Sequence, residues 1–200
     1  MDDRPSLAER KRLQARDRIV RAAEDLFAER GFAAVSVAEI ADRADVGRTT
    51  FFRYFGDKQE VVFAQEQDLL ATIASARSEI DASIPSTLQE AISQLSDIVV
   101  ALCARATQDP MAFSRHCELV ESNPELRARE ALKMQQFSQQ LAEILVSRGA
   151  DSDTAVLASQ IAQACYQTAR ARVGNDPRTL AMQAQAAFEE TLNLGCSPRP

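Results

Sequence analysis

Histidine, tryptophan and paired cysteines are scarce or absent in this chain of 200 residues, and this limits its possible chemistry. His116 is the only histidine, and no Gly-x-Ser-x-Gly segment accompanies it as in many triad hydrolases. The four cysteines, at positions 103, 117, 165 and 196, include no Cys-x-x-Cys pair of the zinc or redox type. His116 and Cys117 are adjacent, and adjacent helical residues point in different directions, so they form no ready metal site. We therefore expect unreactive buried thiols and no enzyme activity, cofactor or metal.

Glycine, proline and long apolar runs are also few. The six glycines and seven prolines fall between helix-like stretches, and no segment alternates apolar and polar residues as a strand would. No apolar run is long enough to span a bilayer, and the polar first residues lack the apolar middle of a signal peptide. These absences predict an all-α protein that is cytoplasmic and has no membrane partner.

Helix ends are marked by local capping chemistry. Gly31 and Gly149 suit the left-handed position that follows a helix. An Asp or Asn precedes proline at 109, 123 and 176, and Asp151 or Ser152 can open another helix. Capping boxes are predicted at Ser36–Glu39, Asp57–Glu60 and Ser86–Gln89. Together these signals predict nine helices, at residues 8–30, 36–43, 47–54, 57–81, 86–108, 110–121, 124–148, 152–173 and 177–194.

Charge is distributed unevenly along the chain, although the net charge is −6. Residues 1–58 carry 12 Lys or Arg and 11 Asp or Glu, whereas residues 59–200 carry 11 and 18. Five basic residues cluster near the start: Arg10, Lys11, Arg12, Arg16 and Arg18. A phosphate-binding end on an acidic body fits this asymmetry, and a solvated helix face is the alternative.

The segment 46–58, "VGRTTFFRYFGDK", mixes aromatic rings with cations. Two short predicted helices flank the turn 44–46, and this spacing describes a helix-turn-helix, packed on the apolar stripe Ile19, Ala23, Leu26 and Phe27. Helical spacing turns Phe51, Tyr54 and Phe55 inward and leaves Arg48, Thr49 and Phe52 on the outer face, with Arg53 to one side. An arginine can donate two hydrogen bonds to guanine, at O6 and N7, and threonines can hydrogen-bond phosphate or a base edge. A lysine such as Lys58 can neutralise a phosphate. We therefore predict a DNA-binding helix.

Residues 16–61, about a quarter of the chain, resemble the DNA-binding domain of the tetracycline-repressor (TetR) family. The resemblance lies in "LFAERGF", "SVAEIADRADV" and "TTFFRYFGDK". It implies that Thr50 and Lys58 bond backbone phosphate, and that Arg48 and Thr49 face bases. The DNA-binding candidates are Arg16, Ser36, Arg48, Thr49, Thr50, Phe52, Arg53 and Lys58.

Two positions depart from that family's pattern. Most members carry serine at the position of Gly47, and glycine is a weaker helix cap. Most carry tyrosine at the position of Phe52, whose ring has no hydroxyl for phosphate and can meet a thymine methyl instead. Arg53, where many relatives have histidine, can replace the lost phosphate bond.

The resemblance implies two domains: residues 1–56 bind DNA, and residues 57–200 bind a small, largely apolar ligand and form a homodimer. The segments 152–173 and 177–194 carry apolar residues on more than one face, which allows a dimer interface there. The ligand-binding candidates are Phe113, His116, Met134, Phe137 and Tyr166, with Arg115 as a further polar group. Each of these is also compatible with plain core or surface.

The function we expect is a transcriptional regulator on a palindromic operator, most simply a repressor that its ligand releases from DNA. Two other classes of protein are compatible with an all-helical chain. One is a helical enzyme, against which the lone histidine and unpaired cysteines argue. The other is a protein–protein adaptor whose helix-turn-helix packs against a partner rather than DNA.

Overall fold

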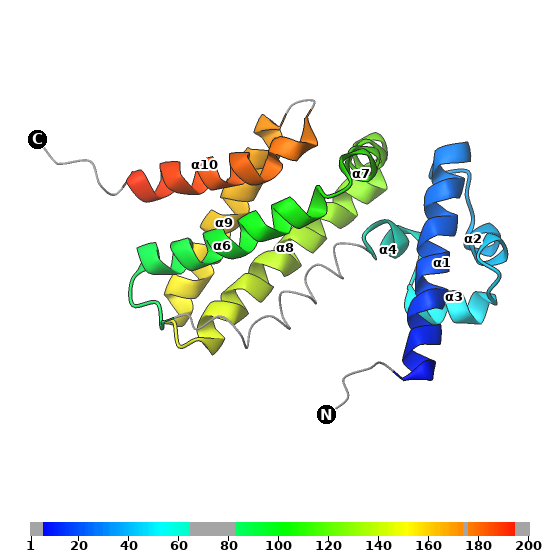
Figure 1. The fold of residues 1–200 in the computed structure, drawn as a ribbon, viewed down its shortest axis with the longest axis horizontal. Coiled ribbons are helices and arrows are strands. Elements are labelled where there is room, and N and C mark those ends of the chain that lie inside the picture. Colours follow the sequence, from blue (N-terminus) through cyan, green and yellow to red (C-terminus); the bar gives the residue numbers. More distant parts are fainter. Residues whose placement is uncertain (1–5, 65–82, 174–175, 195–200) are drawn as a thin grey trace, which may run out of the picture. The chain divides into compact units, whose positions relative to one another are not determined.

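The computed structural model describes residues 6–64, 83–173 and 176–194 (Figure 1). Across these ranges the chain is all-α, with nine α-helices, one short 3₁₀ helix and no strand, as the sequence predicts. Residue contacts divide the chain into two compact units, Met1–Gln67 and Asp68–Pro200. The predicted functional boundary at residues 56/57 stays a prediction. The predicted helix 57–81 is wrong as a continuous helix in its first part, because it is helical over Lys58–Val62 and interrupted at Phe63; its part beyond residue 64 lies outside the described residues.

The described part of the N-terminal unit holds four helices: α1 (Leu7–Arg30), α2 (Val37–Arg43), α3 (Arg48–Tyr54) and α4 (Lys58–Val62). The predicted stripe of α1 is its buried face, since Ile19, Ala23, Leu26 and Phe27 are all under one tenth exposed. Helix α2 packs against α1, and its Ile40 and Ala41 are buried. Each large apolar side chain buried here contributes about 1.5–3 kcal/mol.

The ends of α1 and α2 follow the predicted capping chemistry. Gly31 has φ = +76°, the left-handed conformation that ends a helix at little cost only in glycine. The hydroxyl oxygen of Ser36 accepts from the Glu39 amide, and the Ser36 amide donates to the Glu39 carboxylate at 2.9 Å. Arg30 adds a hydrogen bond of 2.6 Å to the same carboxylate. The capping box therefore also ties α2 to the end of α1.

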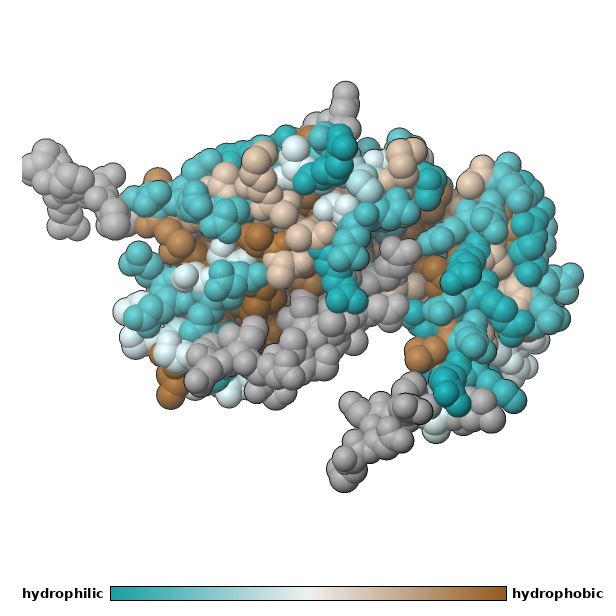
Figure 2. All heavy atoms as spheres, viewed as in Figure 1, coloured by the Kyte–Doolittle hydropathy of each residue, from teal (hydrophilic) through white to brown (hydrophobic). Residues whose placement is uncertain are grey.

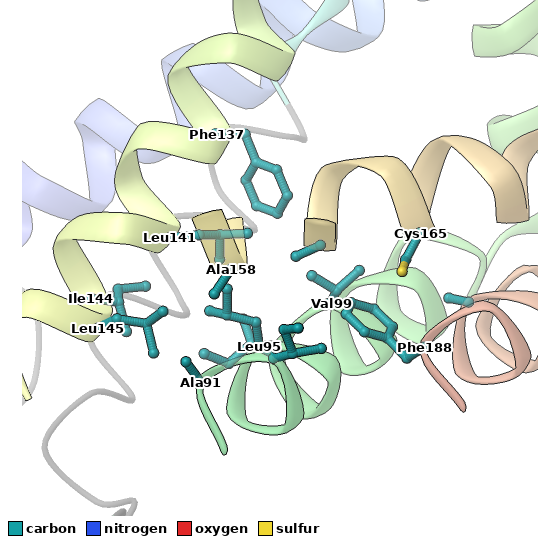
Figure 3. Close-up of a cluster of buried hydrophobic side chains, with 14 of the residues drawn as sticks. Ala91, Leu95, Val99, Phe137, Leu141, Ile144, Leu145, Ala158, Cys165 and Phe188 are labelled. Atoms are coloured by element: carbon teal, nitrogen blue, oxygen red, sulfur yellow. The ribbon is translucent and has the colours of Figure 1, made fainter. Parts of the chain in front are cut away.

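The C-terminal unit contains five α-helices and the 3₁₀ helix Pro177–Thr179 in its described part. The α-helices are α6 (Leu88–Ala106), α7 (Pro110–Ser122), α8 (Pro124–Ser147), α9 (Ser152–Arg172) and α10 (Leu180–Asn193). Side chains from α6, α8, α9 and α10 meet in one buried cluster (Figure 3). Small residues, such as Ala158 and Ala162 of α9, let the helices approach closely within it.

One predicted cap in this unit is wrong by a single position. Thr87, not Ser86, precedes the helix, and its hydroxyl accepts from the Glu90 amide at 3.1 Å. The amide and hydroxyl of Ser86 both donate to the Glu90 carboxylate instead. A carboxylate is a stronger acceptor than the Gln89 amide, and this preference moves the cap by one residue.

The other predicted helix ends are mostly confirmed. Asp57, Asp109 and Asp151 each accept backbone amide hydrogen bonds at the start of the next helix. Asp176 caps the 3₁₀ helix rather than α10 itself. Asn123 precedes α8, but its side-chain amide donates back to the Leu119 carbonyl and makes no cap bond.

The thiols of Cys103 and Cys165 are buried, as expected. Burial raises the pKa of Cys103 to about 12 and raises the pKa of Cys165 as well, so neither forms a thiolate at neutral pH. Cys117 is half-buried, and Cys196 lies outside the described residues. Among the helices that the structure describes, none combines the length and apolar character that crossing a membrane requires.

Candidate nucleic-acid interface

The turn between α2 and α3 is compact. Ala44 is buried, and the Val46 amide donates to the Ala41 carbonyl at 2.9 Å. Asp45 between them has φ = +52°, a left-handed conformation that aspartate tolerates better than most residues. Gly47 then starts α3 without a side-chain cap, as its lack of a side chain implies. The turn of four residues, 44–47, gives the predicted helix-turn-helix.

Helix α3 has one buried and one exposed face, which agrees with the predicted segregation of rings and cations. Phe51 is fully buried and Phe55 is 3% exposed. Arg48, Thr49 and Arg53 are exposed, while Thr50 and Tyr54 are half-buried. Because Phe51 and Phe55 are buried on the inner face, the exposed side chains in the first turn of α3 are accessible to a partner as large as a nucleic-acid duplex.

Phe52 is the unusual member of the exposed face. Its ring is 54% exposed and packs edge-on against Phe51, with 5.5 Å between centroids. An apolar ring held outward in this way suits contact with a thymine methyl or a sugar. It offers no hydrogen bond, so any phosphate contact beside it must come from another residue.

Lys58 has internal partners that sequence reasoning missed. Its ammonium nitrogen donates to the carbonyls of Phe32 and Val35, at 2.9 and 3.0 Å. Two of its three N–H donors therefore hold the turn between α1 and α2. The predicted phosphate contact of Lys58 stays a prediction and would use the third donor.

Arg16 and Ser36 also bond within the N-terminal unit. The Arg16 guanidinium donates to the Ala64 carbonyl at 2.9 Å and lies over the Phe55 ring, 5.5 Å from its centroid. The Ser36 hydroxyl belongs to the capping box. Both residues support the frame that positions α3, and their predicted DNA contacts stay predictions.

The five predicted ligand-binding residues all lie in the C-terminal unit, on three helices. Phe113 and His116 are half-buried on α7, and Met134 on α8 is half-buried as well. Phe137 of α8 belongs to the buried cluster, and Phe113 and Tyr166 pack against its edge. Arg115, the further polar candidate, is exposed.

Arg170 of α9 is a partly buried cation among these residues, and sequence reasoning missed it. Its guanidinium lies 5.7 Å from the Phe113 ring centroid, 3.4 Å from the Tyr166 hydroxyl and 3.4 Å from a Glu130 carboxylate oxygen. Burial acts to lower the pKa of Arg170, but Tyr166, Cys117 and Glu130 outweigh it and raise the pKa above its usual value. The only signal in the sequence was an arginine among the small and apolar residues of 152–173.

Comparison with known proteins agrees with this geometry. Residues 19–64 match the family described as bacterial regulatory proteins, tetR family. The chain is 29% identical to the HTH-type transcriptional regulator TcmR of Streptomyces glaucescens over 157 residues, 74% of this chain and 67% of TcmR. It is 44% identical to the HTH-type transcriptional repressor Rv3405c of Mycobacterium tuberculosis over 68 residues, 32% of this chain and 36% of that relative.

The fold is also similar to a solved structure over nearly its whole length. Thermus thermophilus FadR, a TetR-family transcriptional repressor in complex with lauroyl-CoA, has a TM-score of 0.56 at 21% identity. The similarity covers 92% of this chain and 96% of FadR. The helix-turn-helix, the family match and the named relatives together support a DNA-binding transcriptional regulator. The family match over residues 19–64 and the named relatives support a regulator of the tetR family of bacterial regulatory proteins.

Proposed function

We propose that the protein is a homodimeric repressor that binds a palindromic operator and is released from it by a small, largely apolar ligand. One observation carries the DNA-binding part: Phe51 and Phe55 are buried under α3, while Arg48 and Thr49 are exposed on it. A helix held in this way can enter the major groove with its N-terminal residues toward the base edges.

The residues of this face have different proposed roles. Arg48 donates two hydrogen bonds to one guanine, and Thr49 hydrogen-bonds the edge of a neighbouring base. Phe52 contacts a thymine methyl or sugar. Thr50, Arg53 and Lys58 bond phosphates, which set position rather than sequence preference.

The dimer is supported by apolar side chains that α9 and α10 leave exposed. On α10, Leu180, Ala184 and Phe188 are buried while Met182 is 60% exposed, so the helix has apolar residues on two faces. Val156 and Leu157 of α9 are each about half exposed. On the face shown in Figure 2, apolar patches lie among polar side chains over the C-terminal helices, whereas α1 is covered mainly by polar ones. Because a single recognition helix reads few bases, a two-fold dimer is the expected solution.

The ligand proposal rests on the C-terminal unit. Phe113, Met134, Phe137 and Tyr166 supply apolar and aromatic surface, with His116 and Arg170 as polar groups beside it. Such a combination is typical of sites for small apolar molecules that carry one polar group. FadR, which is similar in fold, was solved with lauroyl-CoA, a ligand of this general kind.

Release from DNA requires that the ligand bind two states of the dimer unequally. In the DNA-bound state the two recognition helices are about 34–36 Å apart, or a multiple of it. The ligand favours a second state in which this spacing has changed, so the half-sites are no longer matched. No chemical change of the ligand is involved.

The test has two stages. Selection from a pool of randomised duplexes with the full chain is expected to enrich a palindrome whose half-sites are one helical turn, or a multiple, apart. Apolar small molecules are then screened for release of that duplex. Failure to enrich any duplex at low salt would refute the regulator function and support the protein–protein adaptor. Enrichment of a single half-site without a palindrome would instead refute only the dimeric mode.

A further inference from the structure

A basic hollow lies between α1 and the end of α3, away from the exposed first turn of α3. Its volume is about 500 Å³, and its lining consists of Lys11, Arg12 and Ala15 from α1 with Arg53 and Tyr54 from α3. All five residues belong to the N-terminal unit. The two segments are about 40 residues apart in the sequence, so only the fold brings these side chains together.

The lining has the chemistry of an anion site. Lys11, Arg12 and Arg53 supply three positive charges, and the five lining residues include no carboxylate. The Arg53 guanidinium lies over the Tyr54 ring, 5.3 Å from its centroid, so the two lining residues form a cation–π contact. Ala15, with its single methyl group, leaves open the space that a longer side chain would fill.

The position of the hollow on α3 favours a phosphate of the DNA backbone. Arg53 follows Arg48 by five residues, which is about 7.5 Å along a helix axis. When the N-terminal residues of a recognition helix reach the bases, its C-terminal end lies nearer the strand that borders the groove. Guanidinium groups bind phosphate oxygens in paired, charge-assisted hydrogen bonds, so Arg53 is well placed for this contact.

We propose that this hollow binds one phosphate of the operator backbone per protomer, held between the cations of α1 and Arg53. The contact lies outside the base-reading face and adds affinity without base preference. It supplies the phosphate hydrogen bonds that Phe52 is unable to make. The proposal rests on DNA being the partner, as proposed above.

The first test removes charge from the hollow. The double variant Lys11→Gln/Arg12→Gln is compared with Arg10→Gln/Arg21→Gln, which removes the same charge from exposed positions of α1 outside the lining. For each, operator binding is titrated against salt concentration. Because each neutralised phosphate contributes about 0.9 to the slope of log K against log[salt], the hollow variant of a dimer is expected to lower the slope by about 2. The selected base preferences should be unchanged.

The second test changes shape without changing charge. Ala15→Leu keeps good helix propensity and fills the hollow, so it is expected to weaken operator binding about tenfold or more, as loss of a charge-assisted contact does. Circular dichroism and the melting temperature confirm that each variant is folded. A variant that has lost its fold is replaced by Ala15→Met, which fills the same space with a flexible chain.

The outcomes separate the two proposals. If the unaltered protein selects an operator but both double variants lower the slope equally, the effect is diffuse charge and the hollow is not a phosphate site. The same conclusion follows if Ala15→Leu binds the operator normally. If the unaltered protein selects no duplex, both the proposed function and this site are wrong.

Discussion

The ammonium nitrogen of Lys58 lies 4.3 Å from the centroid of the Phe32 ring and donates to the Phe32 carbonyl at 2.9 Å. A second hydrogen bond reaches the Val35 carbonyl, and both Phe32 and Val35 are buried. The first residue of α4 therefore holds the turn that joins α1 to α2. In the proposed function the same ammonium also meets phosphate, which would couple the frame of the domain to its DNA contact.

Replacing Lys58 with methionine tests this double role. Lys58→Met keeps most of the apolar stem but loses both hydrogen bonds, and a hydrogen bond to a charged group contributes about 1.5–3 kcal/mol. We expect a lower melting temperature of the N-terminal unit and a salt slope reduced by about 0.9 per protomer. Calorimetry and salt-dependent operator titration measure the two effects. Lower stability with an unchanged slope would leave Lys58 only its structural role.

Replacing Arg48 with alanine tests base reading. A bidentate contact to guanine contributes about 1–3 kcal/mol of discrimination, so Arg48→Ala should lose preference at one position of each half-site. The preferences at the other positions should remain, as measured by competition among single-base operator variants. Arg21→Ala, at an exposed position of α1, is the matched control and should leave all preferences intact. Uniform weakening across sequences would make Arg48 a phosphate contact instead.

Acid should weaken the link between α1 and α2 through Glu39. Hydrogen bonds from Ser36, then from Arg30, lower the pKa of Glu39 from 4.5 to about 2. A depressed folded pKa means that the carboxylate stabilises the fold above pH 4.5 and that this contribution is lost as the pH falls toward 2. Glu39→Gln keeps the shape of the box but has no titrating group.

The melting temperature of the unaltered protein should therefore exceed that of Glu39→Gln at neutral pH. This difference should shrink between about pH 4.5 and pH 2. Circular dichroism melts at a series of pH values measure it. A difference that is constant across this window would show that the ionised carboxylate does not support the fold.

Much of the fold could be predicted from the sequence because helix ends depend on local chemistry. Ser36, Gly31 and Asp109 each act on amides or carbonyls within a few residues, and their roles are as predicted. The segregation of rings and cations on α3 also follows from helical spacing alone. The error at Ser86 arose because two adjacent hydroxyl residues compete and Glu90 selects between them.

What could not be predicted depends on contacts between distant residues. The hydrogen bonds of Lys58 reach carbonyls 23 and 26 residues away, and Arg170 reaches Glu130 across 40 residues. The left-handed Asp45 gave no signal, since no glycine marks the position. These contacts depend on how the helices pack against one another, and local sequence patterns do not specify that packing.

Gly149 should resist substitution for a backbone reason. Its φ of +97° is left-handed, and an added Cβ would lie 3.3 Å from a methyl carbon of Ile84. A left-handed alanine costs about 1–2 kcal/mol, and the exposed Ile84 side chain can move aside at little further cost. Gly149→Ala is therefore expected to lose about 1–2 kcal/mol in denaturant titrations. Gly56→Ala, where φ is ordinary and nothing lies within 4 Å, should be close to neutral.

Assembly should depend on α9 in particular, rather than on exposed apolar residues in general. Leu157 of α9 and Leu132 of α8 are similarly exposed, at 50% and 55%. If α9 lies in the dimer interface, Leu157→Glu buries a charge against the partner and splits the dimer. Leu132→Glu places the same charge in solvent and should leave the dimer intact.

Sedimentation equilibrium distinguishes these outcomes, because the monomer mass is 22.0 kDa. We expect Leu157→Glu to sediment as a monomer and to lose high affinity for the palindrome, while binding of a single half-site persists weakly. That combination follows because each recognition helix remains folded but its partner is no longer held at the groove repeat. A dimer that survives Leu157→Glu, or one that Leu132→Glu also dissociates, would place the interface elsewhere on the C-terminal unit.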